Sequence, residues 1–168
     1  MVLYAFRHIV LEAGGECTCE ARLRDGSSER PDAAITLQAG SFYIDVSITH
    51  PCAASYMHRP AEEQLRAREH LKVNKYQAAA RLEGREVLPL VMDTFGGMAP
   101  HGLTEQLLQL VANQAQANGI ADLDPAKWSV QGLSARLVVA LHRGNACLLE
   151  RGTAAVRNAV QGRRYGLR

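Results

Sequence analysis

Two aspartates, Asp32 and Asp45, interrupt a stretch of sequence that otherwise has the composition of two β-strands. Residues 30–51 read RPDAAITLQAGSFYIDVSITHP, in which turn-forming residues separate two apolar and β-branched runs. This pattern predicts strands at about 31–38 and 41–49. An acid inside a strand calls for a chemical reason, because apolar and β-branched side chains suit a half-buried sheet better.

Strand geometry places the two carboxylates on the same face of this predicted hairpin. If the turn is centred on Ala39–Gly40, residue 34 pairs with Asp45, and Asp32 is the diagonal neighbour of Asp45. The Cβ atoms of the two aspartates then lie about 7 Å apart or less. The residues that alternate with Asp45 are expected to face the core: Ile44, Val46 and Ile48.

Two carboxylates at this distance repel each other unless a cation lies between them. A divalent metal is the simplest such cation. Mg²⁺ takes hard oxygen ligands, and proteins hold it through one or two carboxylates while waters and a substrate phosphate complete its shell. Asp32 and Asp45 are therefore candidate ligands of Mg²⁺ or Mn²⁺. The alternative is that one or both aspartates cap a turn or point to solvent.

A long helix predicted at residues 60–83 supplies candidate cations for the same site. One stripe of this helix combines apolar side chains with a lysine: Leu71, Lys75, Ala78 and Leu82. Lys75 is therefore expected on the side that faces the sheet, with Lys72 and Tyr76 beside it. A lysine in that position must find an anion or reach the edge. The alternatives are an ammonium group that extends to solvent and an ion pair with a purely structural role.

The rest of the chain predicts a single α/β (α+β) domain over residues 1–168. The other predicted elements are helices at 2–13, 102–117 and 128–160 and strands at 16–26 and 86–97. Glycines at 132, 144 and 152 leave open whether the last helix is one or two, and Pro89 indicates a sheet edge or a bulge. This order predicts a mixed four-stranded sheet flanked by helices.

The motif RPD, twelve further residues and then Asp45-Val46-Ser47 resembles the PD-(D/E)xK restriction-like endonuclease superfamily. The predicted order of helix, three-stranded meander, helix and strand matches the fold of that superfamily. Its lysine normally lies two residues after the second acid, where this chain has Ser47. The helix sequence KVNKY at 72–76 resembles the variant found in site-specific non-LTR retrotransposons, in which the lysine has moved to the following helix. VLPLVMDTFGG also resembles the next strand of such proteins.

The resemblance covers residues 5–97, a nuclease-like core, and leaves residues 98–168 as a helical C-terminal extension. It implies a Mg²⁺- or Mn²⁺-dependent DNA endonuclease that nicks the target of a retrotransposon, or a domain derived from one. Asp32 and Asp45 are then metal ligands, and Lys75 or Lys72 is the catalytic cation. Glu12 matches an acid that completes the metal site in some members. A solvent-facing glutamate is the alternative for Glu12.

The resemblance also suggests partners for the chain. These are DNA and, beyond it, RNA or the reverse transcriptase of the same element. Restriction-like nucleases often pair to cut two strands, so a homodimer is an open alternative. A catalytically inactive nucleic-acid-binding or assembly module with the same fold is the second hypothesis for function, and a structural domain of a larger polyprotein is the third.

Four further positions are candidate contacts to nucleic acid: His50, Tyr76, Arg59 and Arg68. His50 follows the strand that carries Asp45, and the arginines belong to a segment in which basic residues cluster. The net charge of +2 does not by itself indicate nucleic-acid binding, because a local basic surface is needed. Each position also has an ordinary structural explanation, such as core packing for Tyr76.

The four cysteines include no CxxC pair. Cys17 and Cys19 lie on one face of a predicted strand and, with a histidine, are a candidate zinc site. Reduced thiols in an intracellular protein are the favoured interpretation. No apolar run is long enough for a transmembrane helix, and residues 1–15 lack the features of a signal peptide. We therefore expect an intracellular protein that is not secreted and that is nuclear if the source is eukaryotic.

Overall fold

A four-stranded mixed sheet forms the centre of the chain in the computed structural model, which describes residues 1–23, 29–53 and 58–164, with side chains up to residue 155. The elements in chain order are α1 (Val2–Glu12), β1 (Glu16–Cys19), β2 (Ala33–Leu37), β3 (Gly40–Ile44), β4 (Val46–Thr49), α2 (Ala61–Leu82), β5 (Glu86–Val87), β6 (Leu90–Asp93), α3 (Leu103–Ala117), a 3-10 turn η1 (Ala121–Leu123) and α4 (Val130–Arg164). The mixed α/β class and the four-stranded mixed sheet agree with the prediction from sequence.

The sheet combines an antiparallel meander with a parallel edge. β1, β2 and β3 pair antiparallel in succession, and β5 pairs parallel to β3. β4 and β6 form a second parallel pair with the same register offset as β3 and β5. The two short ladders are therefore segments of one strand pair that is interrupted at its middle.

Pro89 lies at this interruption, directly opposite Asp45 in the shared register. The N–H of Leu88 donates to the carbonyl of Tyr43 at 3.0 Å, and the N–H of Leu90 donates to the carbonyl of Asp45 at 3.0 Å. Alternate residues of a parallel strand bond to the same neighbour, so Pro89 loses no bond to β3 or β4 by lacking an N–H. The strand that carries Pro89 forms the edge of the sheet, as Pro89 indicated.

The turn between β2 and β3 lies one residue earlier than predicted. Leu37 is the partner of Gly40, so the turn is centred on Gln38–Ala39. The pairing shifts by two residues, which keeps every side chain on its predicted face. The ladder ends with Ala33 opposite Ile44, and the next pair in this register is Asp32 and Asp45. Extended by one residue, this register places the aspartates directly across the hairpin from each other instead of diagonally.

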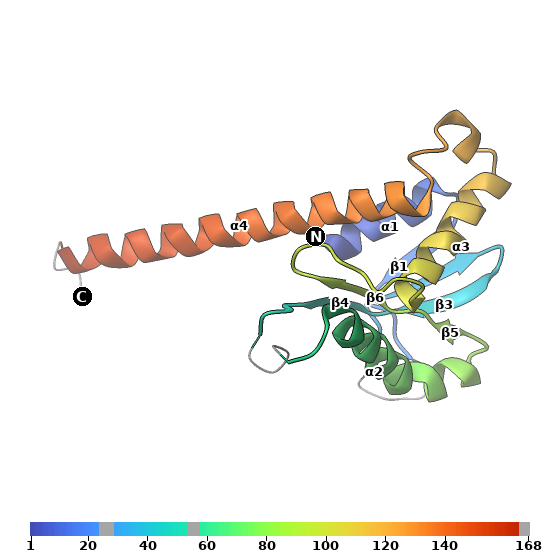
Figure 1. Cartoon of the computed structure of the whole chain (residues 1–168), viewed down its shortest axis with the longest axis horizontal. Helices are drawn as coiled ribbons and strands as arrows, with labels where there is room; N and C mark the ends of the chain where they lie inside the picture. Colours follow the sequence, from blue (N-terminus) through green and yellow to red (C-terminus); the bar gives the residue numbers. More distant parts are fainter. Residues whose placement is uncertain (24–28, 54–57, 165–168) are drawn as a thin grey trace.

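Helices cover both faces of the sheet (Figure 1). α2 packs on one face against β5 and β6, whereas α1 and α3 pack on the other and are crossed by α4. The main core lies under α1 and α3 and joins both halves of the chain; its largest fully buried side chains are Phe6, Ile9, Ile35, Ile44, Leu90, Met92, Leu107, Leu108, Leu133 and Leu137. The helices of residues 98–168 therefore complete this core. No described helix has the length and apolar character needed to cross a membrane.

The outcome for the alternating residues of β3 and β4 is mixed. Ile44 is fully buried and Val46 is partly buried against the main core, as expected. Ile48 was also expected in the core, but 39% of its surface is exposed. The reason is that β4 runs past the covering helices, and Ile48 lines an open groove between β4 and α4.

α4 is one continuous helix of 35 residues, which decides between the two alternatives for this segment. Its first half packs on the body, and its second half extends beyond it (Figure 1). Gly132 lies inside this helix without breaking it. Its lack of a side chain allows the preceding loop to approach closely. A Cβ at Gly132 would lie 2.1 Å from the carbonyl oxygen of Ala126.

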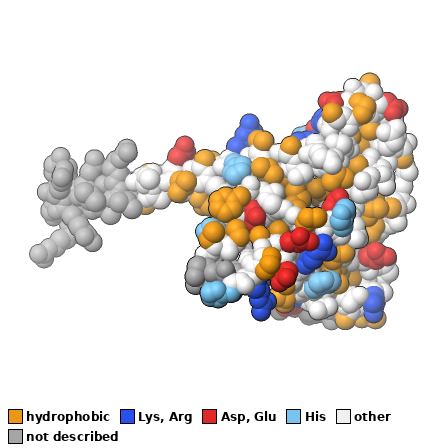
Figure 2. Space-filling model, viewed as in Figure 1, with side chains coloured by type: hydrophobic (Ala, Val, Ile, Leu, Met, Phe, Trp, Pro, Cys, Tyr) orange, Lys and Arg blue, Asp and Glu red, His pale blue; other side chains and the backbone are white. Residues whose placement is uncertain are grey.

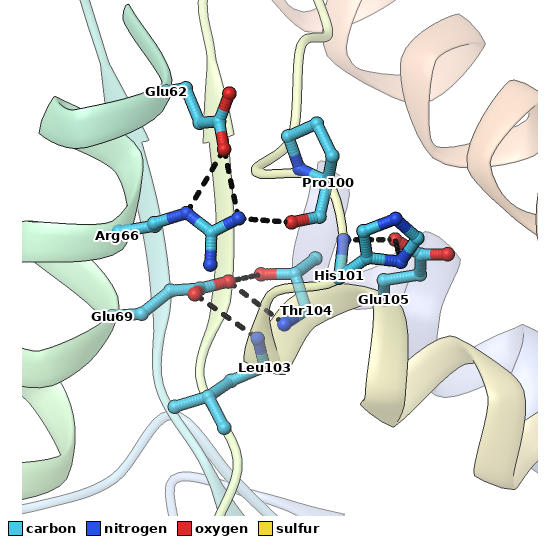
Figure 3. A network of polar contacts seen from close by, with 8 residues as sticks. All are labelled: Glu62, Arg66, Glu69, Pro100, His101, Leu103, Thr104 and Glu105. Atoms are coloured by element: carbon cyan, nitrogen blue, oxygen red, sulfur yellow. Dashed lines mark hydrogen bonds and ion pairs between the residues drawn. The ribbon is translucent and has the colours of Figure 1, made fainter.

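A buried carboxylate joins α2 to the start of α3 (Figure 3). Glu69 of α2 is 3% exposed, and it accepts hydrogen bonds from the N–H groups of Leu103 and Thr104 and from the Thr104 hydroxyl. The Thr104 hydroxyl oxygen in turn accepts from the N–H of Val91 in β6 at 3.0 Å. A carboxylate at a helix N-terminus satisfies free N–H groups and interacts favourably with the helix dipole. This contact fixes α2, β6 and α3 relative to one another.

Replacing Glu69 by alanine should lower the free energy of unfolding by roughly 2–3 kcal/mol, because buried donors at the start of α3 lose their acceptor. Chemical denaturation measures this difference. Glu63→Ala is the matched control, since Glu63 is an exposed glutamate of the same helix. We expect it to change the stability by less than about 0.5 kcal/mol. Equal stabilities of the two variants would contradict the proposed role of Glu69.

Candidate functional site

Asp32 and Asp45 meet where β3 gives way to β4. Asp45 lies between these two strands and is 4% exposed, and Asp32 directly precedes β2 and is partly buried. Asp32 Oδ2 accepts a hydrogen bond from the N–H of Val46 at 2.7 Å. Its carboxylate thus satisfies the first N–H of β4. The backbone of β2 offers no acceptor there, because β2 begins one residue after Asp32. Asp32 holds the strand junction as well as lying beside Asp45.

α2 covers this pair with three polar side chains at successive turns. Lys72 Nζ forms an ion pair with Asp45 Oδ2 in which both side chains are largely buried. One turn earlier, Arg68 Nε donates to Ser47 Oγ at 2.8 Å. One turn later, the hydroxyl of Tyr76, which is 2% exposed, donates to the carbonyl of Arg30 at 3.2 Å.

The stripe that was expected to face the sheet is instead exposed to solvent. Leu71 is 61% exposed and Leu82 is 82% exposed, and Lys75 and Ala78 are exposed with them. The buried residues of α2 are Gln64, Leu65, Glu69, Tyr76, Ala79 and Ala80. This prediction was wrong because polar groups with buried partners, including Glu69, occupy the face that packs on the sheet.

The two candidate lysines therefore have different surroundings. Lys72 contacts Asp45, whereas Lys75 lies on the outer side of α2. Lys75 Nζ forms an ion pair with Glu29 at 2.7 Å and lies 4.9 Å from the centre of the Tyr76 ring. Of the two lysines, only Lys72 lies on the same side of α2 as the aspartates.

Burial governs the ionisation of the groups around the aspartates. The pKa of Asp32 is raised from its ordinary value, first by burial and then by the charge of Asp45, although the Val46 hydrogen bond and the charge of Lys72 oppose this. The pKa of Tyr76 is raised by burial and by the carboxylates of Asp45 and Asp32. The carboxylates of Asp32 and Asp45 thus interact, and the single positive charge of Lys72 does not fully offset their negative charges.

Glu12 does not join the aspartates. It ends α1, on the other face of the sheet from α2, and it forms ion pairs with Arg136 at 2.5 Å, Lys127 at 3.4 Å and His8 at 3.2 Å. Burial opposes the ionisation of Glu12, but the hydrogen bonds and charges of Arg136 and Lys127 outweigh it and hold its pKa below the ordinary value. Glu12 therefore connects α1 to the segment that begins α4, and we withdraw it as a metal ligand.

The remaining candidate contacts to nucleic acid lie around the ends of β4 and α2. His50 is exposed, and its Nδ1 lies 3.1 Å from the hydroxyl of Thr94. Arg59 is exposed just before α2, and its carbonyl accepts from Gln64 Nε2 at 2.7 Å. Sequence reasoning did not find the contact between Ser47 and Arg68. The spacing of Arg68, Lys72 and Tyr76 at every fourth residue was the signal that pointed to this face.

Among the described residues the cysteine pair has no metal-binding neighbours. Cys17 and Cys19 are partly buried thiols on β1. Burial and the neighbouring Cys19 raise the pKa of Cys17 to about 11, which keeps this thiol protonated at neutral pH. Across residues 1–23, 29–53 and 58–155 no three His, Cys, Asp or Glu side chains are grouped so that they could hold a metal ion.

Asp32 and Asp45 fit a magnesium ion that is held by two carboxylates. They follow the last ladder pair of the hairpin, the charge of Asp45 raises the pKa of Asp32, and each carboxylate engages its Oδ2 atom with the protein. The second oxygen of each carboxylate is the candidate ligand. Mg²⁺ commonly retains several waters and takes one or two protein carboxylates, so a third protein ligand is not required.

The sequence matches no known protein-family model. No curated protein matches it either.

We expect Asp32→Asn to raise the melting temperature at neutral pH in the absence of divalent metal. The folded protein raises the pKa of Asp32 above its ordinary 3.8, so ionising this carboxyl costs stability once the pH exceeds that value. The gain should therefore disappear as the pH falls below the ordinary pKa. The asparagine side chain can still accept a hydrogen bond from the N–H of Val46. Asp32→Ala loses this acceptor, so it should be about 1 kcal/mol less stable than Asp32→Asn. An Asp32→Asn protein that melts lower than wild type at every pH would contradict this.

Glu12→Gln should destabilise the protein by about 1 kcal/mol at neutral pH, because the ion pairs of Glu12 are partly exposed. The lowered pKa of Glu12 means that its contribution is complete above its ordinary value of 4.5 and is lost as the pH falls through the lower folded value. Denaturation curves at several pH values test this. The exposed Glu16→Gln is the control, and a Glu12→Gln difference that persists in strong acid would refute the assignment.

Proposed function

We propose that this chain is a metal-dependent endonuclease that hydrolyses DNA phosphodiester bonds. The observation that supports the proposal best is the cluster of Asp32, Asp45 and Lys72. It brings two carboxylates and one ammonium group from three elements to a single interruption of the sheet. The order of helix, meander, helix and parallel edge strand adds support, because it is the order of restriction-like endonucleases. The target-nicking domain of a retrotransposon, or a domain derived from one, is the setting that we favour.

The residues of the cluster have distinct roles in this proposal. Asp32 and Asp45 would hold Mg²⁺ or Mn²⁺, which would supply acidification of a water and stabilisation of charge on the scissile phosphate. With Asp45 engaged by a metal ion, Lys72 would be available to stabilise the negative charge that develops on the phosphate oxygens. One water adds to phosphorus, the bond to the leaving oxygen breaks, and that oxygen takes up a proton. A DNA strand is thereby nicked.

Arg68 is the candidate contact to the DNA backbone beside this cluster. Its guanidinium group is held by Ser47, the residue at the position of the usual strand lysine. Two other cations of α2 have acidic partners: Arg66 pairs with Glu62, and Lys75 pairs with Glu29. Arg68 has no such partner among the described residues, and its terminal nitrogens are suited to a phosphate.

The second candidate function is a catalytically inactive module that binds nucleic acid or assembles with the RNA or reverse transcriptase of the same element. Ser47 in place of the strand lysine favours it. On the face shown in Figure 2, acidic and basic side chains are interspersed instead of forming a continuous basic surface. Broad electrostatic attraction to DNA is therefore weak on that face, and binding must depend on local contacts.

Incubation of supercoiled plasmid with the protein and Mg²⁺ or Mn²⁺ should convert it to the nicked form. Lys72→Ala should slow nicking roughly a hundredfold to a thousandfold, because the charge on the phosphate loses its cation. Asp45→Asn should abolish nicking, since a metal ligand is lost. Lys75→Ala is the matched control from the same helix, and we expect it to nick at a rate close to that of wild type.

Removing one partner of a buried ion pair can lower the free energy of unfolding by roughly 3–5 kcal/mol. The fold of each variant must therefore be checked by circular dichroism. The double variant Asp45→Asn/Lys72→Met removes both charges, and it should remain folded while being unable to nick. Nicking by this folded double variant, or binding without nicking by wild type under every metal, would overturn the endonuclease proposal.

A further inference from the structure

An exposed aromatic pair, His50 and Phe95, lies at the end of the strand that begins at the candidate site. Phe95 is 63% exposed, which is unusual for a ring in a short turn close to the core. The two ring centres are 6.0 Å apart with an angle of 63° between their planes. We propose that this pair is a stacking site for an unpaired nucleobase, so that the substrate is DNA with a single-stranded segment. The choice of a nucleic acid as ligand rests on the proposed function.

The turn that carries Phe95 is held in place by several contacts. The Asp93 carboxylate accepts from the N–H groups of Phe95 and Gly97, both at 2.8 Å, and the N–H of Asp93 donates to the Gly97 carbonyl at 2.9 Å. Gly96 has a φ of 95° and packs against α4, where a Cβ would lie 2.7 Å from Val138. The backbone that carries the exposed ring is therefore fixed by the fold and is not a loose loop.

His50 is positioned from the neighbouring strand. Its Nδ1 lies 3.1 Å from the hydroxyl of Thr94, and the N–H of Thr94 donates to the carbonyl of Thr49 at 2.8 Å. With its orientation fixed, the imidazole stands at an angle to the phenyl ring and forms a corner with it. A planar base can stack on one ring of such a corner and contact the edge of the other.

The position of the corner suits a strand that also reaches Asp45. β4 follows Asp45 and ends at Thr49, so His50 lies five residues further along the chain. At about 3.3 Å per residue this separation is roughly 16 Å. It corresponds to about five nucleotides of a stacked strand at about 3.4 Å each. Among the described strands β4 pairs only with β6, so beyond the N–H of Val46, which Asp32 occupies, its other edge is not paired with a strand.

Two arginines in segments that follow or face β4 can supply cations to the phosphates of a nucleic acid. Arg59 is exposed in the segment that follows β4, and Arg151 of α4 lines the groove that contains Ile48. Asp93, the acid of the turn that carries Phe95, is 8% exposed and is engaged with backbone N–H groups. Bases in an intact duplex are already stacked on each other, so this site selects a base that is unpaired.

Binding of a labelled oligothymidylate and of a blunt duplex of the same length tests this inference, in buffer with a chelator so that no strand is cut. Phe95→Ala should weaken binding of the single strand roughly tenfold, which is typical of one stacked base, and leave duplex binding nearly unchanged. Leu123→Ala is the control, because Leu123 is 90% exposed and lies in η1. It should not change binding of either DNA.

Phe95→Trp provides a second measurement that does not depend on loss of function. The new tryptophan should bind the single strand as well as wild type, and its fluorescence should be quenched when the strand is added. Trp128 is 4% exposed, and the wild-type protein supplies its background signal. Equal single-strand affinities of Phe95→Ala and wild type, or an unchanged Phe95→Trp emission at saturation, would overturn the stacking site.

The outcomes separate this inference from the endonuclease proposal. Metal-dependent nicking that requires Asp45, together with normal single-strand binding by Phe95→Ala, refutes the stacking site alone. Loss of single-strand binding in Phe95→Ala without any nicking by wild type refutes the endonuclease alone. If the wild-type protein binds neither the single strand nor the blunt duplex, the stacking site is refuted too.

Discussion

The burial of the Asp45 carboxylate is the constraint on which the packing of α2 against the sheet depends. A carboxylate with almost no contact to water needs a cation in direct contact, and Lys72 is that cation. Once Lys72 faces Asp45, helical geometry brings Arg68 to Ser47 and Tyr76 over the start of the hairpin. The same helix therefore cannot turn its apolar stripe inward. Leu71 and Leu82 remain in solvent although inward packing would bury more apolar surface.

Part of this arrangement was predictable from sequence because it depends on local rules. Strand alternation placed Asp32 and Asp45 on one face, and this survived an error in the turn because the pairing moved by an even number of residues. The error arose because every residue of Gln38-Ala39-Gly40-Ser41 tolerates a turn. The ends of α2 followed from Pro60 and Gly84, whose backbone preferences suit the start and the end of a helix.

The rest depended on contacts between distant parts of the chain. Hydrophobic periodicity assumes that the buried side of a helix is apolar, so it selected the wrong face of α2, where Glu69 and Lys72 have buried partners. Glu12 was misplaced because its partners, Lys127 and Arg136, lie more than a hundred residues away in sequence. The helices beyond residue 97 looked like an extension for a similar reason. Their role in the core is visible only when Leu107 and Leu133 meet Ile44 and Phe6.

The capping of α3 by Glu69 has a consequence for how the molecule meets anions. The free N–H groups at the start of a helix are a common place for a phosphate to bind, aided by the helix dipole. Here the protein's own carboxylate occupies that place, held under α2 by Thr104 (Figure 3). An internal anion thus competes permanently with any external one at this helix end. For a polyanion that approaches the same side of the sheet, Arg68 and Lys72 are the candidate cations beside the aspartates.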